Sequence, residues 1–263
     1  IGMPAILIDI NQIEVFRGPQ SSIFGANAMA GLISMHTHDP KNQFEAMVQT
    51  GVATDNGKNI GAMINAPIVK NLSTRFTIYS GQENGFRENV YRNTMDSNGK
   101  SEMMVRNKTL WTPSPKFQVK LTSLFADQDN KYDVWAPDNN ETLQTYSDND
   151  GKDSQESQSF SIRSSLRNIG NIDLISITTY SKNESEYSYD ADWGNAGFWS
   201  KEPYNVDGWD YTATETTLRD RTTLTQELRL LGNLKNNSSF TSGIYWKNLL
   251  ENYDLNGYWD GDY

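Results

Sequence analysis

From residue 44 onward, the chain is a succession of short segments in which apolar and polar positions alternate. In the clearest of them, Phe117, Val119 and Leu121 lie on one face of a strand. Gln118 and Lys120 lie on the other face. Similar segments begin near residues 44, 58, 72, 101, 160, 172, 222 and 240. The pattern predicts about nine half-buried strands after the first forty residues.

The connections between these segments alternate in length. After a tight turn at 55–57, short connections at 67–71, 113–116, 168–171 and 233–237 alternate with long ones at 85–100, 127–157 and 187–221. Successive connections of an antiparallel meander lie at opposite ends of the strands, so all the short ones share one rim. Transmembrane β-barrels have this asymmetry, whereas soluble sandwiches mix connection lengths at both ends. The pattern favours a transmembrane antiparallel β-barrel, with an ordinary soluble β-protein as the alternative.

The first forty residues follow a different pattern, with two short apolar runs on either side of a turn. We predict strands at 13–17 and 31–37, and a single helical turn around 21–24 between them. Gly18 gives access to positive φ, and Pro19 fixes its own φ and removes a donor.

Two further segments complete this region. The apolar run at 5–10 predicts another short strand, and 39–43 reads as a linker.

Composition agrees with many half-buried strands joined by polar loops. Only 36% of residues are hydrophobic and the mean hydropathy is -0.68, yet aromatic residues reach 11%, and disordered chains are poor in aromatics. The net charge of -10 speaks against nucleic acid as a partner. The absence of cysteine excludes disulfides, thiolate metal sites and a cysteine nucleophile.

Catalytic motifs are not found. The Gly-rich stretch lacks the Gly-Lys-Ser/Thr ending of a phosphate loop, and no G-x-S-x-G elbow occurs. His36 and His38 share a strand face with metal-binding spacing but lack a third nearby ligand. These patterns supply no catalytic candidate, and we expect no metal site at the two histidines.

One long motif near the start of the chain resembles a known family. It reads Ile13-Glu14-Val15-Phe16-Arg17-Gly18-Pro19-Gln20, then Phe24-Gly25, then Ala30-Gly31-Leu32-Ile33. This resembles the plug-domain signature of TonB-dependent outer-membrane receptors. The resemblance implies a barrel of about 22 strands whose lumen holds an α+β plug. By it, residues 1–40 are the C-terminal part of the plug and 41–263 the first strands of the barrel, about nine of the 22. Because the chain starts at Ile1 and stops inside a polar turn, we expect a fragment.

The resemblance also implies a function and partners. The plug signature comprises Glu14, Arg17, Gly18, Pro19, Gln20, Gly25 and Gly31. Glu14 and Arg17 are candidate partners for charges on the barrel wall, although Arg17 could equally fix the turn. The expected function is import of a scarce nutrient across the bacterial outer membrane, most commonly a ferric siderophore, with vitamin B12, haem or an oligosaccharide as alternatives. Expected partners are membrane lipid, the ferric chelate and the TonB–ExbB–ExbD complex, whose contact segment lies outside this sequence.

Two of the predicted long loops carry candidate binding residues. Asp148, Asp150 and Asp153 surround a Gly turn that partly resembles a calcium loop, so we consider weak Ca²⁺ binding beside the alternative of a solvated loop.

The second loop is rich in aromatic residues, with Trp193, Trp199, Tyr204 and Trp209 as candidate ligand-binding residues. Such side chains can stack on a sugar or an aromatic chelator, and they can equally pack on one another. A secreted β-rich glycan-binding module, or a passive or adhesive outer-membrane barrel, is therefore a further alternative.

Overall fold

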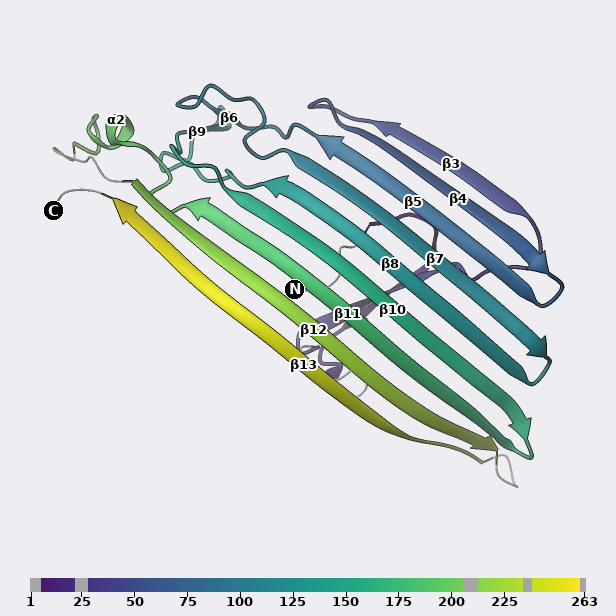
Figure 1. The fold of residues 1–263 in the computed structure, drawn as a ribbon. Helices are drawn as coiled ribbons and strands as arrows, with labels where there is room; N and C mark the ends of the chain where they lie inside the picture. Colours follow the sequence, from purple (N-terminus) through teal and green to yellow (C-terminus); the bar gives the residue numbers. More distant parts are fainter. Residues whose placement is uncertain (1–5, 22–27, 206–211, 234–237, 261–263) are drawn as a thin grey trace.

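The computed structural model describes residues 6–21, 28–205, 212–233 and 238–260, and within these the chain is mostly β (Figure 1). One antiparallel sheet, which we call the wall, contains nine strands in the order in which they occur along the chain. These are β3 (Glu45–Val52), β4 (Lys58–Val69), β5 (Leu72–Glu83), β7 (Lys100–Ser114), β8 (Phe117–Lys131), β10 (Lys152–Ile169), β11 (Ile172–Asp190), β12 (Thr212–Asn233) and β13 (Ser239–Asp260). The predicted meander of nine strands is confirmed.

The remaining elements are small. β1 (Ile10–Arg17) and β2 (Gly31–Thr37) form an antiparallel hairpin behind the wall, drawn in purple in Figure 1. We call this pair, with residues 6–9 before it and 38–41 after it, the inner hairpin. β6 (Glu88–Asn89) and β9 (Gln144–Thr145) pair between two long loops, and α2 (Ala196–Trp199) lies in a third. None of the helices in the described part of the chain is long and apolar enough to cross a membrane.

Connection lengths alternate as predicted. Residues 70–71, 115–116, 170–171 and 234–238 connect strands at one rim, and 84–99, 132–151 and 191–211 at the other (Figure 1). These connections of two to five residues therefore share an edge, and the long loops with β6, β9 and α2 gather at the opposite edge. We call the latter edge the loop rim.

The strands extend further toward the loop rim than the sequence pattern predicts. The long connections expected at 127–157 and 187–221 are shorter, because β10 begins at Lys152 and β12 at Thr212. In these extensions the partners are polar, as in the row Asp127–Glu156–Glu184. Backbone pairing continues there while the apolar alternation that marks a strand disappears, so the predicted boundaries are wrong.

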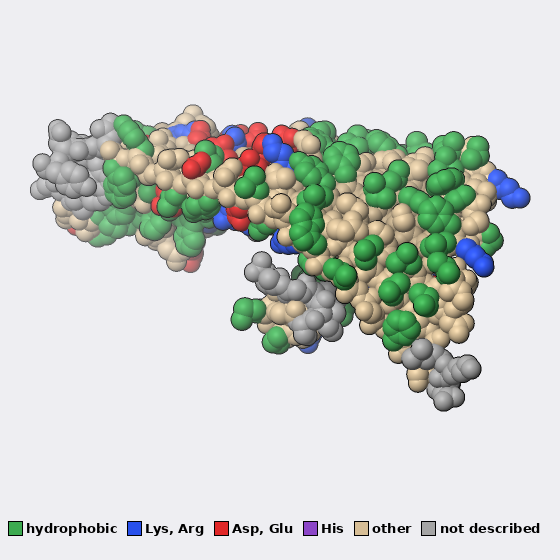
Figure 2. All heavy atoms as spheres, turned by 60° about the horizontal axis from the view of Figure 1, so that its bottom comes forward, with side chains coloured by type: hydrophobic (Ala, Val, Ile, Leu, Met, Phe, Trp, Pro, Cys, Tyr) green, Lys and Arg blue, Asp and Glu red, His purple; other side chains and the backbone are tan. Residues whose placement is uncertain are grey.

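The two faces of the wall have opposite character. On β7, Met104, Arg106 and Lys108 are buried beneath the inner hairpin, whereas Met103 and Trp111 are exposed on the outer face. Exposed apolar side chains of the outer face include Ile60, Ile64, Phe76, Ile78, Trp111, Leu121, Phe160, Ile162, Leu228, Ile244 and Trp246. Figure 2 shows them as a green field over the sheet, separated from the loop rim by a cluster of charged side chains. An apolar surface of this extent is typical of contact with lipid.

A small apolar core joins the inner hairpin to the wall. Ile8, Met104 and Ala126 are almost fully buried there. A Cβ added to Gly61 of β4 would lie 2.2 Å from Ile8 Cδ1, so the glycine allows the close approach. The expected strand at 5–10 is wrong over 6–9, because the chain bends there and Asp9 adopts φ 57°. The bend turns both Ile8 and Asp9 into the wall, and this contact outweighs the local strand preference.

Candidate functional site

Asp9 of the inner hairpin forms a buried ion pair with the wall. Arg75 of β5 donates from Nε to Asp9 Oδ2 at 2.9 Å and from Nη2 to Oδ1 at 2.6 Å. The two side chains are 3% and 4% exposed. Arg75 also donates to Glu45 Oε2 at 2.9 Å, and Arg106 lies 3.6 Å from Asp9 while donating to the Ile8 carbonyl. A bidentate, desolvated pair of this kind fixes position as well as attracting charge.

A second set of contacts holds the other end of the inner hairpin. Lys108 Nζ donates to the carbonyls of Thr37 and His38 at 2.9 and 3.0 Å and to Asp39 Oδ1 at 3.0 Å. Lys120 of β8 donates to both oxygens of Asp39. The alternation along β8 had placed Lys120 on the polar face of that strand, and in the structure this face contacts the inner hairpin.

The segment that leads from the inner hairpin into the wall is also fixed by hydrogen bonds. Asn65 of β4 is fully buried, accepts from the Lys41 backbone N–H at 2.9 Å and donates to the Lys41 and Gln43 carbonyls. Residues 38–44 form neither helix nor strand, as predicted for a linker over 39–43.

Between the inner hairpin and the wall lies a polar cavity of about 640 Å³. Its lining includes Met35, His36, His38, Lys108, Lys120 and Arg163. Arg163 comes from β10, where it pairs in register with Lys120 of β8. His36 Nε2 forms hydrogen bonds with Glu14 Oε2 at 3.2 Å and with Ser34 Oγ at 3.1 Å. Neither His36 nor His38 belongs to a cluster of side chains that could hold a metal among the described residues. Asp39 also lines the cavity and pairs with both lysines, so the cationic groups there are partly neutralised.

The plug-signature residues lie mostly within the inner hairpin rather than against the wall. Glu14 pairs with His36 across β1 and β2, and no ion pair joins Glu14 or Arg17 to the wall among the described residues. The wall contacts come instead from Asp9 and Asp39, which flank the motif. A signal for them existed in the sequence, since each is a lone carboxylate next to an apolar strand.

The turn residues have identifiable roles. Gly18 has φ +82°, and Gln20 follows Pro19 and donates its backbone N–H to Ala28 O at 2.7 Å. A Cβ on Gly31 would lie 2.7 Å from the Phe16 carbonyl oxygen, so β1 and β2 approach closely only because Gly31 lacks one. Gly25 lies outside the described residues.

This difference between the two glycines gives a testable prediction. Gly31→Asn should destabilise the inner hairpin by about 1–3 kcal/mol, because its Cβ must push the β1 backbone aside. Gly18→Asn should cost less, about 1 kcal/mol, because nothing lies within 4 Å of the new Cβ and Asn is among the residues that best tolerate the positive φ. Hydrogen exchange of the β1 and β2 amides measures both. Equal exchange in the two variants would contradict the steric account.

At the loop rim, the aromatic candidates separate into two groups. Trp199 and Tyr204 pack on each other with ring centroids 5.1 Å apart, and Phe198 contacts both and stacks on Tyr146. Trp193 lies against Trp135 instead, at 6.3 Å. Trp209 lies outside the described residues. The two long loops thus form one group of aromatic side chains that pack on one another, and a separate tryptophan pair that is partly exposed.

Carboxylates also gather at the loop rim, but in a different set from the one expected. Oxygens of Asp148, Asp190 and Asp192 all lie within 4.8 Å of one another. Asp150 forms an ion pair with Arg92 instead, and Asp153 is exposed on β10; neither is in the group. Burial raises the pKa of the Asp190 carboxyl well above its ordinary value, and the neighbouring Asp192 raises it further. Sequence reasoning missed Asp190 and Asp192 because they lie at and just after the end of β11, about 40 positions from Asp148 along the chain.

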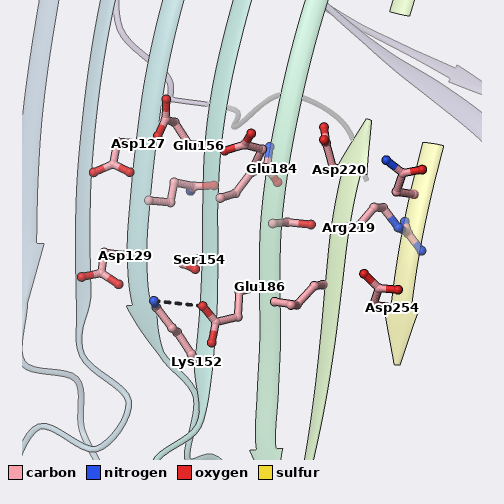
Figure 3. A pocket seen from close by; sticks show the side chains of 15 residues that line it. Asp127, Asp129, Lys152, Ser154, Glu156, Glu184, Glu186, Arg219, Asp220 and Asp254 are labelled. Atoms are coloured by element: carbon pink, nitrogen blue, oxygen red, sulfur yellow. Dashed lines mark hydrogen bonds and ion pairs between the residues drawn. The ribbon is translucent and has the colours of Figure 1, made fainter. Parts of the chain in front are cut away.

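A second hollow, of about 500 Å³, lies among the charged side chains on the outer face of the wall, away from the inner hairpin (Figure 3). Asp127, Glu156, Glu184 and Asp220 form one row across it, on the face opposite to Ala126, which packs on Ile8. Lys152 crosses it to Glu186 at 3.1 Å. The hollow therefore faces away from the cavity behind the wall.

Comparison with solved structures identifies the same fold in transport proteins. The siderophore receptor PiuA from Acinetobacter baumannii matches 93% of this chain with 17% identity and a TM-score of 0.73. The ferric-catecholate import receptor Fiu from E. coli K12 matches 92% with 15% identity and a TM-score of 0.72. The copper transporter OprC matches 92% with 13% identity and a TM-score of 0.63. In fold, the chain is mostly β and resembles part of the barrel of TonB-dependent outer-membrane receptors.

The match covers only part of these neighbours. The chain spans 36% of the length of PiuA, 40% of Fiu and 34% of OprC. No protein-family model matches the sequence.

Proposed function

We propose that this chain is part of a TonB-dependent outer-membrane receptor that imports a scarce nutrient. The observation that carries the proposal is the inner hairpin, which is held on one face of a barrel-like wall by the buried ion pair of Asp9 and by the more exposed ion pairs of Asp39. An element that must move to let cargo pass is better held by polar contacts than by a large apolar core. Polar groups can exchange their partners for water, whereas exposed apolar area costs about 25 cal/mol per Å².

The cargo we propose is a ferric siderophore or another iron complex. PiuA and Fiu are named as siderophore and ferric-catecholate receptors, and the Trp135–Trp193 pair at the loop rim offers a surface on which an aromatic chelator could stack. OprC is named as a copper transporter, so the fold accommodates other metals. Vitamin B12, haem and oligosaccharides remain the alternative cargoes.

The outer membrane is the location we propose, with lipid against the exposed apolar field and TonB–ExbB–ExbD as the energy source. Transport of this kind needs no covalent step, so we propose a receptor and not an enzyme. The extent of the apolar outer face disfavours a secreted glycan-binding module, which would expose that area to water.

Growth of a deletion strain under iron limitation tests the function. The strain should fail to grow on at least one single iron source, chosen from a ferric catecholate, a ferric hydroxamate and haem, and the gene supplied in trans should restore growth. Radiolabelled uptake of that source should also vanish in a strain that lacks TonB. Uptake that persists without TonB would overturn the proposal, and so would unchanged growth on every iron source, vitamin B12 and oligosaccharide tested.

A further inference from the structure

We propose that Asp148, Asp190 and Asp192 form a calcium site that joins two long loops at the loop rim. Asp190 ends β11, Asp192 follows it in the loop 191–211, and Asp148 comes from the loop 132–151. The inference concerns the loops of the proposed receptor and does not depend on which cargo it takes.

The spacing of the carboxylates fits one ion. Ca²⁺ binds oxygen at about 2.3–2.6 Å, so two ligands of one ion lie at most about 5 Å apart. Oxygens of all three side chains fall within 4.8 Å of one another. Backbone and side-chain donors already orient two of the ligands: Trp193 N–H binds Asp190 Oδ1 at 2.8 Å, and Thr212 Oγ1 donates to Asp148 Oδ1 at 2.8 Å.

One oxygen in the group is buried without a partner. Asp192 is 6% exposed; its Oδ2 accepts from Trp199 Nε1 at 3.1 Å, while its Oδ1 is buried and has no hydrogen-bond partner. Asp190 is 4% exposed. No lysine or arginine forms an ion pair with any of the three within the described residues. Buried carboxylates without cationic partners are costly unless they take up a proton or coordinate a metal, and one divalent cation would satisfy all three carboxylates at once.

The ligand chemistry selects calcium. All the side-chain ligands are carboxylates, which are hard oxygen donors, and no histidine or cysteine belongs to the group. Three ligands, from the end of β11 and from two loops, leave several positions for water or carbonyl oxygens, which suits the variable coordination of Ca²⁺ better than the strict octahedron of Mg²⁺.

The site would order the aromatic loop. Trp199 donates a hydrogen bond from Nε1 to Asp192, and Trp193 donates one from its backbone N–H to Asp190. Each of the two aromatic groups at the loop rim is therefore hydrogen-bonded to a proposed calcium ligand. Asp148 N–H also donates to Gly194 O at 3.0 Å, which ties the two loops at the same point. Calcium binding should therefore fix the aromatic side chains and protect both loops from local opening.

Terbium luminescence on the purified protein in detergent, with no cargo present, tests the site. Tb³⁺ replaces Ca²⁺ in oxygen sites, and Trp199 next to Asp192 should sensitise its emission. We expect saturable emission that Ca²⁺ competes away, and at least tenfold weaker binding in Asp192→Asn. Asp150→Asn is the matched control, in the loop that supplies Asp148, and should bind within twofold of the wild type, because Asp150 pairs with Arg92.

Thermal unfolding separates a calcium site from a merely structural carboxylate cluster. Calcium should raise the Tm of the wild type and of Asp150→Asn but not that of Asp192→Asn. In a chelator, Asp192→Asn should be at least as stable as the wild type, because the substitution removes a buried charge. No saturable Tb³⁺ emission in the wild type would overturn the site, as would wild-type affinity in Asp192→Asn. Either result would leave TonB-dependent uptake untouched, since the assay contains no cargo.

Discussion

Asp9→Asn is expected to release the start of the inner hairpin from the wall at a cost of about 3–5 kcal/mol. The Asp9 carboxylate is 3% exposed and is the shared partner of Arg75 and Arg106. Removal of one member of a buried pair leaves the other charge desolvated and uncompensated, which costs about this amount. Arg75 keeps its ion pair with Glu45, so its share of the cost is the smaller one. Arg106 loses its only ion-pair partner among the described residues.

Hydrogen exchange of the β1 amides measures this release. A cost of about 3 kcal/mol corresponds to roughly 100-fold faster exchange through local opening. Glu14→Gln is the matched control, because it makes the same chemical change within β1 at a residue that contacts only its own hairpin. We expect it to exchange within about threefold of the wild type. If Asp9→Asn exchanges no faster than Glu14→Gln, the ion pair does not hold the hairpin.

The coupling itself can be isolated with a double-mutant cycle. Combining Asp9→Asn with Arg75→Gln should cost less than the sum of the two single changes, because each single change already breaks the same pair. Strict additivity would mean that the two residues act independently, despite the distances of 2.6 and 2.9 Å between them.

Lys108→Met should loosen the other end of the inner hairpin by about 2–3 kcal/mol. Lys108 is 8% exposed and makes three hydrogen bonds to residues 37–39, two of them to backbone carbonyls that would lose this partner. Loss of a charged donor from these partly buried acceptors costs about 1.5–3 kcal/mol. The measurement is again hydrogen exchange, at the amides of β2 and of His38.

Lys120→Met serves as the comparison for Lys108→Met. Its side chain is 24% exposed, and within the described residues its ion pairs and hydrogen bonds are with Asp39 alone, so we expect a loss below about 1 kcal/mol. The structure therefore predicts a larger loss of stability for Lys108→Met than for Lys120→Met. A larger loss from Lys120→Met would show that the exposed ion pair, and not the buried carbonyl contacts, holds this end.

Salt and not pH should modulate the Asp39 contacts near neutrality. Burial alone would raise the pKa of the Asp39 carboxyl, but hydrogen bonds from Lys120 and Lys108 lower it below its ordinary value of 3.8. The stabilisation from this carboxylate is therefore fully present above pH 3.8 and is lost only as the pH falls through the lower value. Added salt should weaken the exposed Lys120 contact more than the buried Lys108 contact.

The sequence by itself determined the wall and the turn that precedes it. Apolar alternation identified nine strands, connection lengths placed the long loops on one rim, and the residues around Gly18 and Gly31 predicted the inner hairpin. These features depend on local geometry, a side-chain period of two and the conformations open to Gly and Pro, so a linear pattern carries them.

Only the tertiary structure decided which charges meet. Asp9 and Arg75 are 66 positions apart, and Asn149 binds Asp190 across 41 positions, so no sequence spacing relates them. The sequence pattern also did not predict how far β10, β11 and β12 extend toward the loop rim, because both faces are polar there and only backbone pairing continues the strands. Contacts of this kind depend on strand register and on how far the loops fold over the rim, which the alternation of residues along one strand does not specify.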